Sequence, residues 1–113
     1  MIAKNFRLKR GEISYLLKKG MTQKSKLFII RYAKSNLGNS RYAITASAKF
    51  NAKAVDRNRI RRQAYEAIRL ITKTNILKPH DLVLIPKKQI FKSDFVAIKA
   101  DIERIVSDLA DHE

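Results

Sequence analysis

The sequence predicts an α+β fold in a single small domain, and three observations support this prediction. The chain has 113 residues, 45% of them apolar, which is enough for one core and too little for two. Apolar residues alternate with a period of two in some segments and recur at helical spacing in others. These segments follow one another in the order α-β-β-α-β-α, with no internal repeat or linker. We therefore expect residues 1–113 to form a mixed sheet packed on helices, with a long arginine-rich central helix.

The amino-terminal part predicts a basic arm followed by a short helix. Residues 1–8 are expected to be a flexible arm that neutralises nucleic-acid backbone charge. The next segment, Arg10–Lys19, is expected to be helical, with Gly20 as its terminator. Its apolar residues fall at helical spacing: Ile13, Leu16 and Leu17. A helix this short is marginal alone, so it must pack on the rest of the fold.

Two strands are expected next. In Leu27–Ala33, Phe28, Ile30 and Tyr32 share one face, and the residues between them share the other. The segment Lys34–Ser40 carries turn residues, and Arg41–Ser47 alternates again. Strands joined in this way predict a β-hairpin.

The second half of the chain predicts a long helix, a buried strand and a final helix. The central helix is expected from about Asn51 to Thr74. Its apolar stripe consists of Ile60, Ala64, Ala67, Ile68 and Ile71. The continuous apolar run in Asp81–Pro86 predicts a central strand that is buried on both faces. Ser93 is the expected N-cap of the last helix. The inner face of that helix is expected to hold Phe95, Ile98, Ile102, Ile105, Val106 and Leu109.

The net charge of +15 favours a polyanionic partner. Residues 1–92 hold 23 Lys and Arg against 4 Asp and Glu, a balance of +19, whereas residues 93–113 hold 2 against 6, a balance of −4. The acidic carboxyl end is therefore expected to face away from the ligand. Cysteine is absent, no apolar run approaches the ~20 residues that span a bilayer, and the amino end has no signal-peptide pattern. We expect a cytoplasmic protein with no membrane role and no small-molecule substrate.

The densest cationic cluster lies in the central helix, in the segment 57–62 with the sequence RNRIRR. Arginine forks match phosphate oxygens, and a helix can present several of them on a rigid support. The alternative is a solvated helix face with Asp56 or Glu66 as local ion-pair partners. Against this alternative, Arg57 and Arg61 repel each other one turn apart, a cost expected where a ligand supplies the counterion. The cluster therefore favours nucleic-acid contact.

This region resembles the signature of the protein subunit of bacterial ribonuclease P. The stretch 41–69, RYAITASAKFNAKAVDRNRIRRQAYEAIR, joins a strand that begins with Arg to an RNR helix. The matching residues are Arg41, Lys49, Ala54, Arg57, Asn58, Arg59, Arg61, Arg62, Glu66 and Arg69. Chain length, element order and basicity agree over nearly the whole chain. The sequence departs from the family pattern at Ala48 and Tyr65, where basic residues are common, and at Ile13 and Leu17, where phenylalanine is common.

The resemblance implies a ribonucleoprotein in which RNA performs catalysis. Such a protein binds a catalytic RNA, and holds the 5′ leader of precursor tRNA between the sheet and the first helix. The RNA, with Mg²⁺, then cuts the precursor endonucleolytically to leave the mature 5′ end. The resemblance also implies a left-handed βαβ crossover. The residues expected to bind the catalytic RNA are Arg57, Asn58, Arg59, Arg61, Arg62, Arg69, Lys49 and Lys53. The residues expected to bind the leader are Phe28, Arg31, Tyr32, Ile13 and Leu17.

The aromatic residues leave two interpretations open. A ring that stacks on a base contributes about 1–3 kcal/mol with little sequence preference, which suits a variable leader. For Phe28 and Tyr42 taken singly, the hydrophobic core is the favoured interpretation, and Phe28 stays a leader candidate because the strand register is open. Tyr32 and Arg31 are better leader candidates, because a polar group at the edge of a binding surface has a reason to be there.

A catalytic site on the protein itself finds little support. His80 and His112 are isolated. The carboxylates of the last helix are expected to form an acidic face remote from the arginines: Asp101, Glu103, Asp108 and Asp111. No phosphate loop, catalytic triad or metal-ligand spacing occurs, so we expect no cofactor and no metal on the protein. The main alternative function is that of a ribosomal or other structural RNA-binding protein. A DNA-binding module and an autonomous nuclease are further alternatives.

Overall fold

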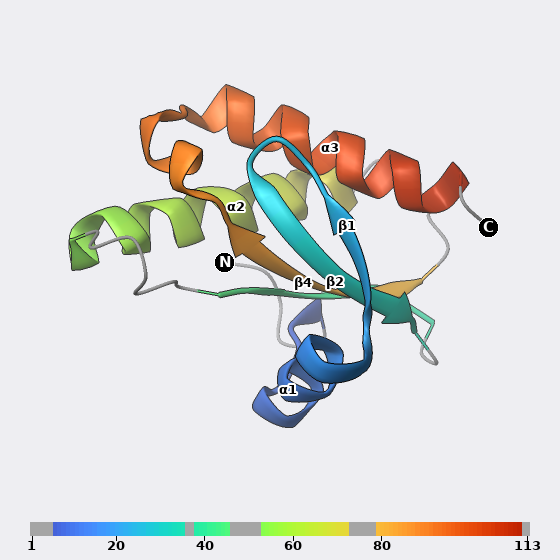
Figure 1. Ribbon diagram of the computed structural model, residues 1–113. Coiled ribbons are helices and arrows are strands. Elements are labelled where there is room, and N and C mark those ends of the chain that lie inside the picture. Colours follow the sequence, from blue (N-terminus) through green and yellow to red (C-terminus); the bar gives the residue numbers. More distant parts are fainter. Residues whose placement is uncertain (1–5, 36–37, 46–52, 73–78, 112–113) are drawn as a thin grey trace.

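The computed structural model describes residues 6–35, 38–45, 53–72 and 79–111. Figure 1 shows its helices and strands, coloured along the sequence from blue to red. The helices are α1 (Arg10–Lys19), α2 (Ala54–Thr72), the short 3₁₀ helix η3 (Lys88–Lys92) and α3 (Phe95–Asp111). The strands are β1 (Met21–Lys24), β2 (Phe28–Lys34), β3 (Arg41–Ile44) and β4 (His80–Pro86). The predicted α+β class, the first helix and the long central helix are confirmed.

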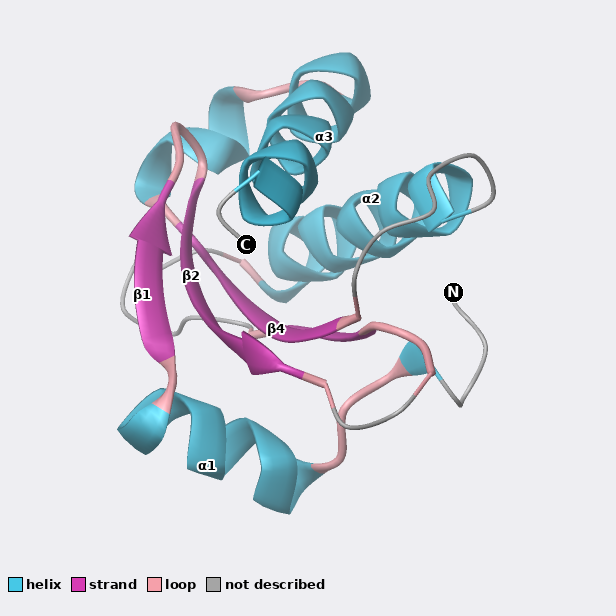
Figure 2. Ribbon diagram, turned by 90° about the vertical axis from the view of Figure 1, so that its right-hand side faces the viewer, coloured by secondary structure: helices cyan, strands magenta, loops and turns pink. Residues whose placement is uncertain are grey.

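The four strands form one mixed sheet in the order β1-β2-β4-β3. β4 pairs antiparallel with β2 and parallel with β3, so its predicted central position is confirmed. The two parallel strands, β3 and β4, are joined through α2, and the left-handed crossover that the resemblance implies for this βαβ unit stays a prediction. Figure 2 shows α2 and α3 on one face of the sheet and α1 on the other. The sheet therefore has a thick helical layer on one side and a single short helix on the opposite side.

The hairpin predicted from the first two expected strands is wrong. These strands are β2 and β3, and β4 lies between them in the sheet. The hairpin instead joins β1 and β2, with Met21 opposite Tyr32 and Lys24 opposite Ile29. Its turn is closed by Ser25, whose N–H donates to the Phe28 carbonyl at 2.9 Å and whose Oγ accepts the Phe28 N–H at 3.1 Å. β1 is four residues long and mostly exposed, so its sequence carries no apolar alternation from which it could be predicted.

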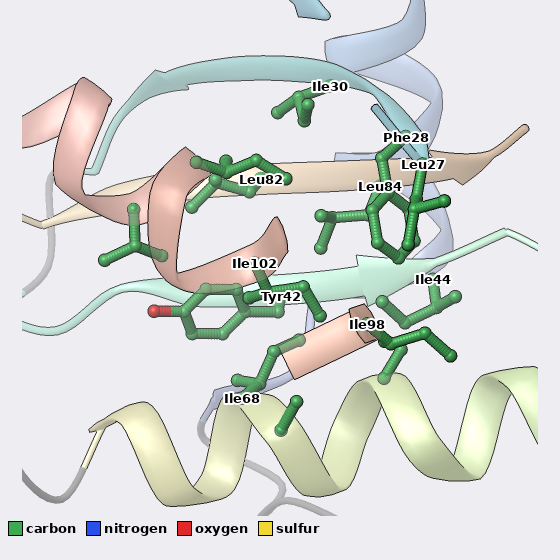
Figure 3. Close-up of a cluster of buried hydrophobic side chains, with 14 of the residues drawn as sticks. Leu27, Phe28, Ile30, Tyr42, Ile44, Ile68, Leu82, Leu84, Ile98 and Ile102 are labelled. Atoms are coloured by element: carbon green, nitrogen blue, oxygen red, sulfur yellow. The ribbon is translucent and has the colours of Figure 1, made fainter. Parts of the chain in front are cut away.

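The main core lies between the sheet and the two long helices (Figure 3). Every residue of the predicted α2 stripe is at most 3% exposed, which confirms the helical phase. On α3 the predicted inner residues are buried, except that Phe95 is only partly buried. The sheet contributes alternate residues to this core: Phe28 and Ile30 from β2, Tyr42 and Ile44 from β3, and Leu82 and Leu84 from β4. Burial also raises the pKa of the Tyr42 hydroxyl.

The last helix begins differently from the prediction. Asp94, and not Ser93, caps α3: its Oδ1 accepts the Ala97 N–H at 2.9 Å and its carbonyl accepts the Ile98 N–H at 3.1 Å. Ser93 instead ends η3, since its N–H donates to the Ile90 carbonyl at 3.0 Å. The 3₁₀ turn that precedes α3 moves the cap by one residue.

Two hydrogen bonds that the sequence did not reveal satisfy backbone groups on the outer edge of β3. The Leu8 N–H donates to the Tyr42 carbonyl at 3.0 Å, and Leu8 is itself buried, so the predicted arm is docked at its carboxyl end. Further along the edge, the Tyr65 hydroxyl accepts the Ile44 N–H at 3.3 Å. The tyrosine that replaces a common basic residue thus satisfies a buried backbone donor.

Gly20 ends α1 as expected, but for a different reason. Its backbone is extended (φ −71°, ψ 162°), so no left-handed conformation is required there. A Cβ at this position would lie 2.6 Å from the Leu16 carbonyl oxygen and 3.2 Å from that of Tyr32. Glycine therefore allows the last turn of α1 to approach β2 closely.

Candidate nucleic-acid interface

The face of α2 that points away from the core is cationic. Because the apolar stripe is buried, the residues on the other side of the helix face solvent. Asn58 and Arg62 are exposed, and Arg57 and Arg61 are partly buried at the sides of the stripe. Lys53 is exposed and directly precedes the helix, whereas Lys49 lies outside the described residues. The structure thus gathers most of the predicted RNA-binding residues on one helix face.

The arginines of this face differ in how far the protein itself neutralises them. The side chains of Arg61 and Arg62 form no hydrogen bond or ion pair with any other described residue. Arg69 forms a hydrogen bond with Glu66 (Nε to Oε2, 3.0 Å), and this contact raises the pKa of Arg69. The local ion pair considered for Glu66 is therefore present near the carboxyl end of the helix. Arg61 and Arg62 therefore keep a charge that a ligand can neutralise.

Arg59 has a structural contact in addition to any contact with RNA. Its Nη1 donates to Gln63 Oε1 at 3.0 Å, and its Nη2 donates to the Phe91 carbonyl at 3.1 Å. The second bond joins α2 to η3. The second arginine of the RNR motif thus helps to hold η3 against α2.

The predicted leader-binding residues separate onto the two faces of the sheet. Phe28 is 0% exposed and belongs to the main core, so it presents no ring surface to a base and the core interpretation applies. Tyr32 lies on the same face and meets the ring of His80 edge-on, with a centroid distance of 6.1 Å. Ile13 and Arg31 lie on the opposite face, where α1 packs. Tyr32 and Arg31 therefore do not form one binding surface, because successive residues of a strand point to opposite faces.

Arg31 is bound to the carboxyl end of α1. Its Nε donates to the Leu16 carbonyl at 3.3 Å and its Nη2 to the Leu17 carbonyl at 3.1 Å, while its Nη1 contacts the Thr22 hydroxyl. A guanidinium at this position satisfies terminal carbonyls and opposes the negative end of the helix dipole. The structure shows that Arg31 docks α1 to β2, whereas its binding of the leader stays a prediction.

Arg41 holds the amino end of α1 in the same way. Its Nε and Nη2 donate to the two carboxylate oxygens of Asp81 at 3.0 and 2.8 Å, and its Nη1 forms an ion pair with Glu12. The Asp81 hydrogen bonds are the largest cause of a raised pKa at Arg41. The pKa of Glu12 is lowered, first by the hydrogen bond from the Lys9 N–H and then by Arg41, against the opposing effect of burial. The Arg41–Asp81 contact had one signal in the sequence: the two residues lie at the starts of two predicted strands.

Between α1 and the sheet lies a partly exposed aliphatic surface. Leu17 is 43% exposed, and Ile29 and Ile85 are partly buried and face each other across β2 and β4. Ile13 and Ile85 also pack against the small cluster formed by Leu8, Leu16, Ala43 and Val83. Ile13, one of the two predicted first-helix contacts, therefore packs on this face of the sheet, while Leu17 is exposed on the same helix.

The carboxylates of α3 do not form the uniform acidic face that was expected. Asp101 is 7% exposed, and its Oδ2 accepts the Ser25 hydroxyl at 2.6 Å and the Leu27 N–H at 3.0 Å, which ties α3 to the β1–β2 turn. A shallow cavity of about 250 Å³ lies beside this contact and is lined by none of the predicted RNA-contacting residues. Within the described ranges, no group of three or more potential metal-ligating side chains occurs, and no helix has the length and apolarity to cross a membrane.

Comparison with known proteins agrees with this architecture. The sequence model of the family described as Ribonuclease P matches residues 2–110. The chain is 28% identical to the ribonuclease P protein component of Caldanaerobacter subterraneus, over 87% of this chain and 83% of that protein. It is 30% identical to that of Syntrophomonas wolfei, over 89% and 84%. The RNase P protein from Thermotoga maritima superposes with a TM-score of 0.78 at 27% identity, covering 88% of this chain and 94% of that one. A structure of the Staphylococcus aureus RNase P protein, 22% identical with a TM-score of 0.77 over 93% and 94%, shows the same fold.

Proposed function

The chain belongs to the ribonuclease P protein family, and we propose that it is the protein subunit of ribonuclease P, which binds the catalytic RNA and the 5′ leader of precursor tRNA. Family membership makes it an RNA-binding component of a tRNA-processing ribonucleoprotein. The observation that carries the finer proposal concerns Arg61 and Arg62 on α2, whose side chains have no partner among the described residues. Phosphates of a folded RNA would neutralise them and release counterions.

The leader is proposed to lie on the aliphatic surface between α1 and the sheet, near Ile13 and Leu17. Leu17 is exposed there, and Arg31 brings positive charge to the same region. Aliphatic side chains can pack against a base without reading its identity, which suits a leader whose sequence varies. Tyr32 faces the other side of the sheet, so it is not part of this proposed surface.

Catalysis is proposed to belong to the RNA subunit, which binds the Mg²⁺ that the cleavage requires, in the cytoplasm where precursor tRNA is processed. The protein would act through electrostatics and geometry: it would stabilise the folded RNA and raise affinity for substrates that carry a leader. Such interactions accelerate cleavage by positioning the reacting groups.

The experiment that tests the function is cleavage of precursor tRNA by the catalytic RNA at low magnesium concentration, with and without this protein. The protein is expected to increase the cleavage rate, and to increase affinity for a leader-bearing substrate more than for leaderless tRNA. A structural or ribosomal RNA-binding protein would leave the rate unchanged. The protein alone is expected to cut nothing; cutting without added RNA would indicate an autonomous nuclease.

Replacing Arg61 and Arg62 together by glutamine is expected to weaken binding to the catalytic RNA. Each lost phosphate contact removes up to about 0.9 from the slope of log affinity against log salt concentration, so the slope should fall by up to about two. Glutamine keeps helix propensity and both arginines lie off the buried stripe, so the fold should be retained. The matched control, Lys99→Gln with Arg104→Gln on α3, removes the same charge and should keep the slope. An unchanged slope in the α2 variant would remove this face from the interface.

A further inference from the structure

A second group of exposed cations lies on η3. The single buried side chain of this short helix is Ile90, which is 0% exposed and fixes η3 to the core. On either side of it, Lys88 and Lys92 are exposed to solvent. The two lysines therefore project from a fixed segment and not from a loose loop.

η3 lies beside α2 (Figure 1), and a hydrogen bond from an arginine of α2 joins the two elements. The Arg59 Nη2 donates to the carbonyl of Phe91, the residue before Lys92, at 3.1 Å. Arg62 follows Arg59 by three residues, so the two are neighbours on the helix surface. The cationic face of α2 thus continues onto η3, and we call Arg59, Arg62, Lys88 and Lys92 the α2–η3 ridge.

The charge of this ridge is not balanced by ion pairs within the described part of the protein. Among the residues that the structure describes, no carboxylate forms an ion pair with any of its four members. On the neighbouring α3 the situation differs, since Lys99 pairs with Glu103 at 2.7 Å. Four cations on two connected elements repel one another, and a row of phosphates relieves that repulsion.

We propose that the RNA backbone bound by α2 continues across η3, where Lys88 and Lys92 contact further phosphates of the same catalytic RNA. This proposal rests on the proposed function and extends the interface beyond α2. Lysine contacts to phosphate position an RNA without reading its sequence, so the added contacts should strengthen binding independently of the bases. Arg59 has a connecting role, because its bond to Phe91 sets the position of η3 relative to α2.

The test compares the double variant Lys88→Gln with Lys92→Gln against the wild-type protein in binding to the catalytic RNA over a range of salt concentrations. The salt slope is expected to fall by about one to two units. The matched control is again Lys99→Gln with Arg104→Gln, which removes two charges from α3. Ile90 is kept, and circular dichroism with thermal unfolding verifies the fold of both variants.

A wild-type slope and affinity in the η3 variant would overturn the proposal, and so would an equal loss in the α3 control, because the effect would then follow net charge alone. The α2 variant, Arg61→Gln with Arg62→Gln, separates the two proposals in the same assay. If it loses affinity while the η3 variant does not, the extension fails and the proposed function stands. If the wild-type protein does not bind the catalytic RNA, both fail.

Discussion

Replacement of Arg41 by methionine is expected to lower the free energy of unfolding by about 2–4 kcal/mol, because it leaves two carboxylates without their cation. The side chains of Arg41 and Asp81 are 17% and 15% exposed, so little water is available to replace the lost bonds. The Glu12 side chain is more exposed, at 34%. Because of this exposure, the expected loss of unfolding free energy is smaller than for a fully buried ion pair. Urea denaturation measures the effect. Arg104→Met, at an exposed position on α3, is the control and should change stability by less than about 0.5 kcal/mol.

The same contact should make the effect of Arg41→Met depend on pH. The pKa of Glu12 is lower in the folded protein than its ordinary value of 4.5. Its stabilising contribution is therefore fully present above pH 4.5 and is lost as the pH falls through the folded-state pKa. The difference between wild type and variant should accordingly shrink in acid. A difference equal to that of the Arg104→Met control at neutral pH would show that Arg41 does not hold α1.

Replacement of Asp101 by alanine is expected to cost about 2–4 kcal/mol of unfolding free energy. One carboxylate oxygen accepts both the Ser25 hydroxyl and the buried Leu27 N–H, and hydrogen bonds to a charged group are worth about 1.5–3 kcal/mol each. Loss of the acceptor leaves the Leu27 N–H unsatisfied at the β1–β2 turn. Thermal or urea unfolding measures the effect.

The control for this change is Glu103→Ala, two residues along the same helix. Glu103 is exposed and pairs with Lys99 at i,i+4, a contact worth about 0.3–0.5 kcal/mol. If all the carboxylates of α3 belonged to a solvated acidic face, the two variants would behave alike. Equal losses would therefore contradict the structural role of Asp101.

The long helices and the central strand could be predicted because their signals are local. The stripe from Ile60 to Ile71 repeats at helical spacing, and the run of residues 82–85 is apolar enough to require burial on both faces. The arginine cluster of α2 is equally local, since four arginines in six residues on one amphipathic helix must include exposed ones. For these elements the residue types alone carry the information.

The sheet order could not be predicted, because it depends on partners far apart in the chain. β2 and β3 are consecutive and separated by turn residues, yet β4 inserts between them and pairs with both. β1 has no apolar pattern of its own and becomes a strand only by hydrogen bonding to β2. Closeness in sequence favours a hairpin between β2 and β3, but in the structure each of them pairs with the distant strand β4.

By itself, the sequence determined the α+β class, the positions of α1, α2 and β4, and the cationic face of α2, because each depends on the spacing of residues within one segment. Only the tertiary structure decided what individual polar residues do. It placed Phe28 in the core and Tyr32 on the helical face of the sheet, and it turned Arg31 and Arg41 inward to hold the two ends of α1. The physical reason is that the same guanidinium can bind a phosphate, a helix terminus or a carboxylate. The residue type alone therefore does not tell which partner an arginine has. The partners of these two arginines lie on other elements, and only the folded chain brings them within hydrogen-bonding distance.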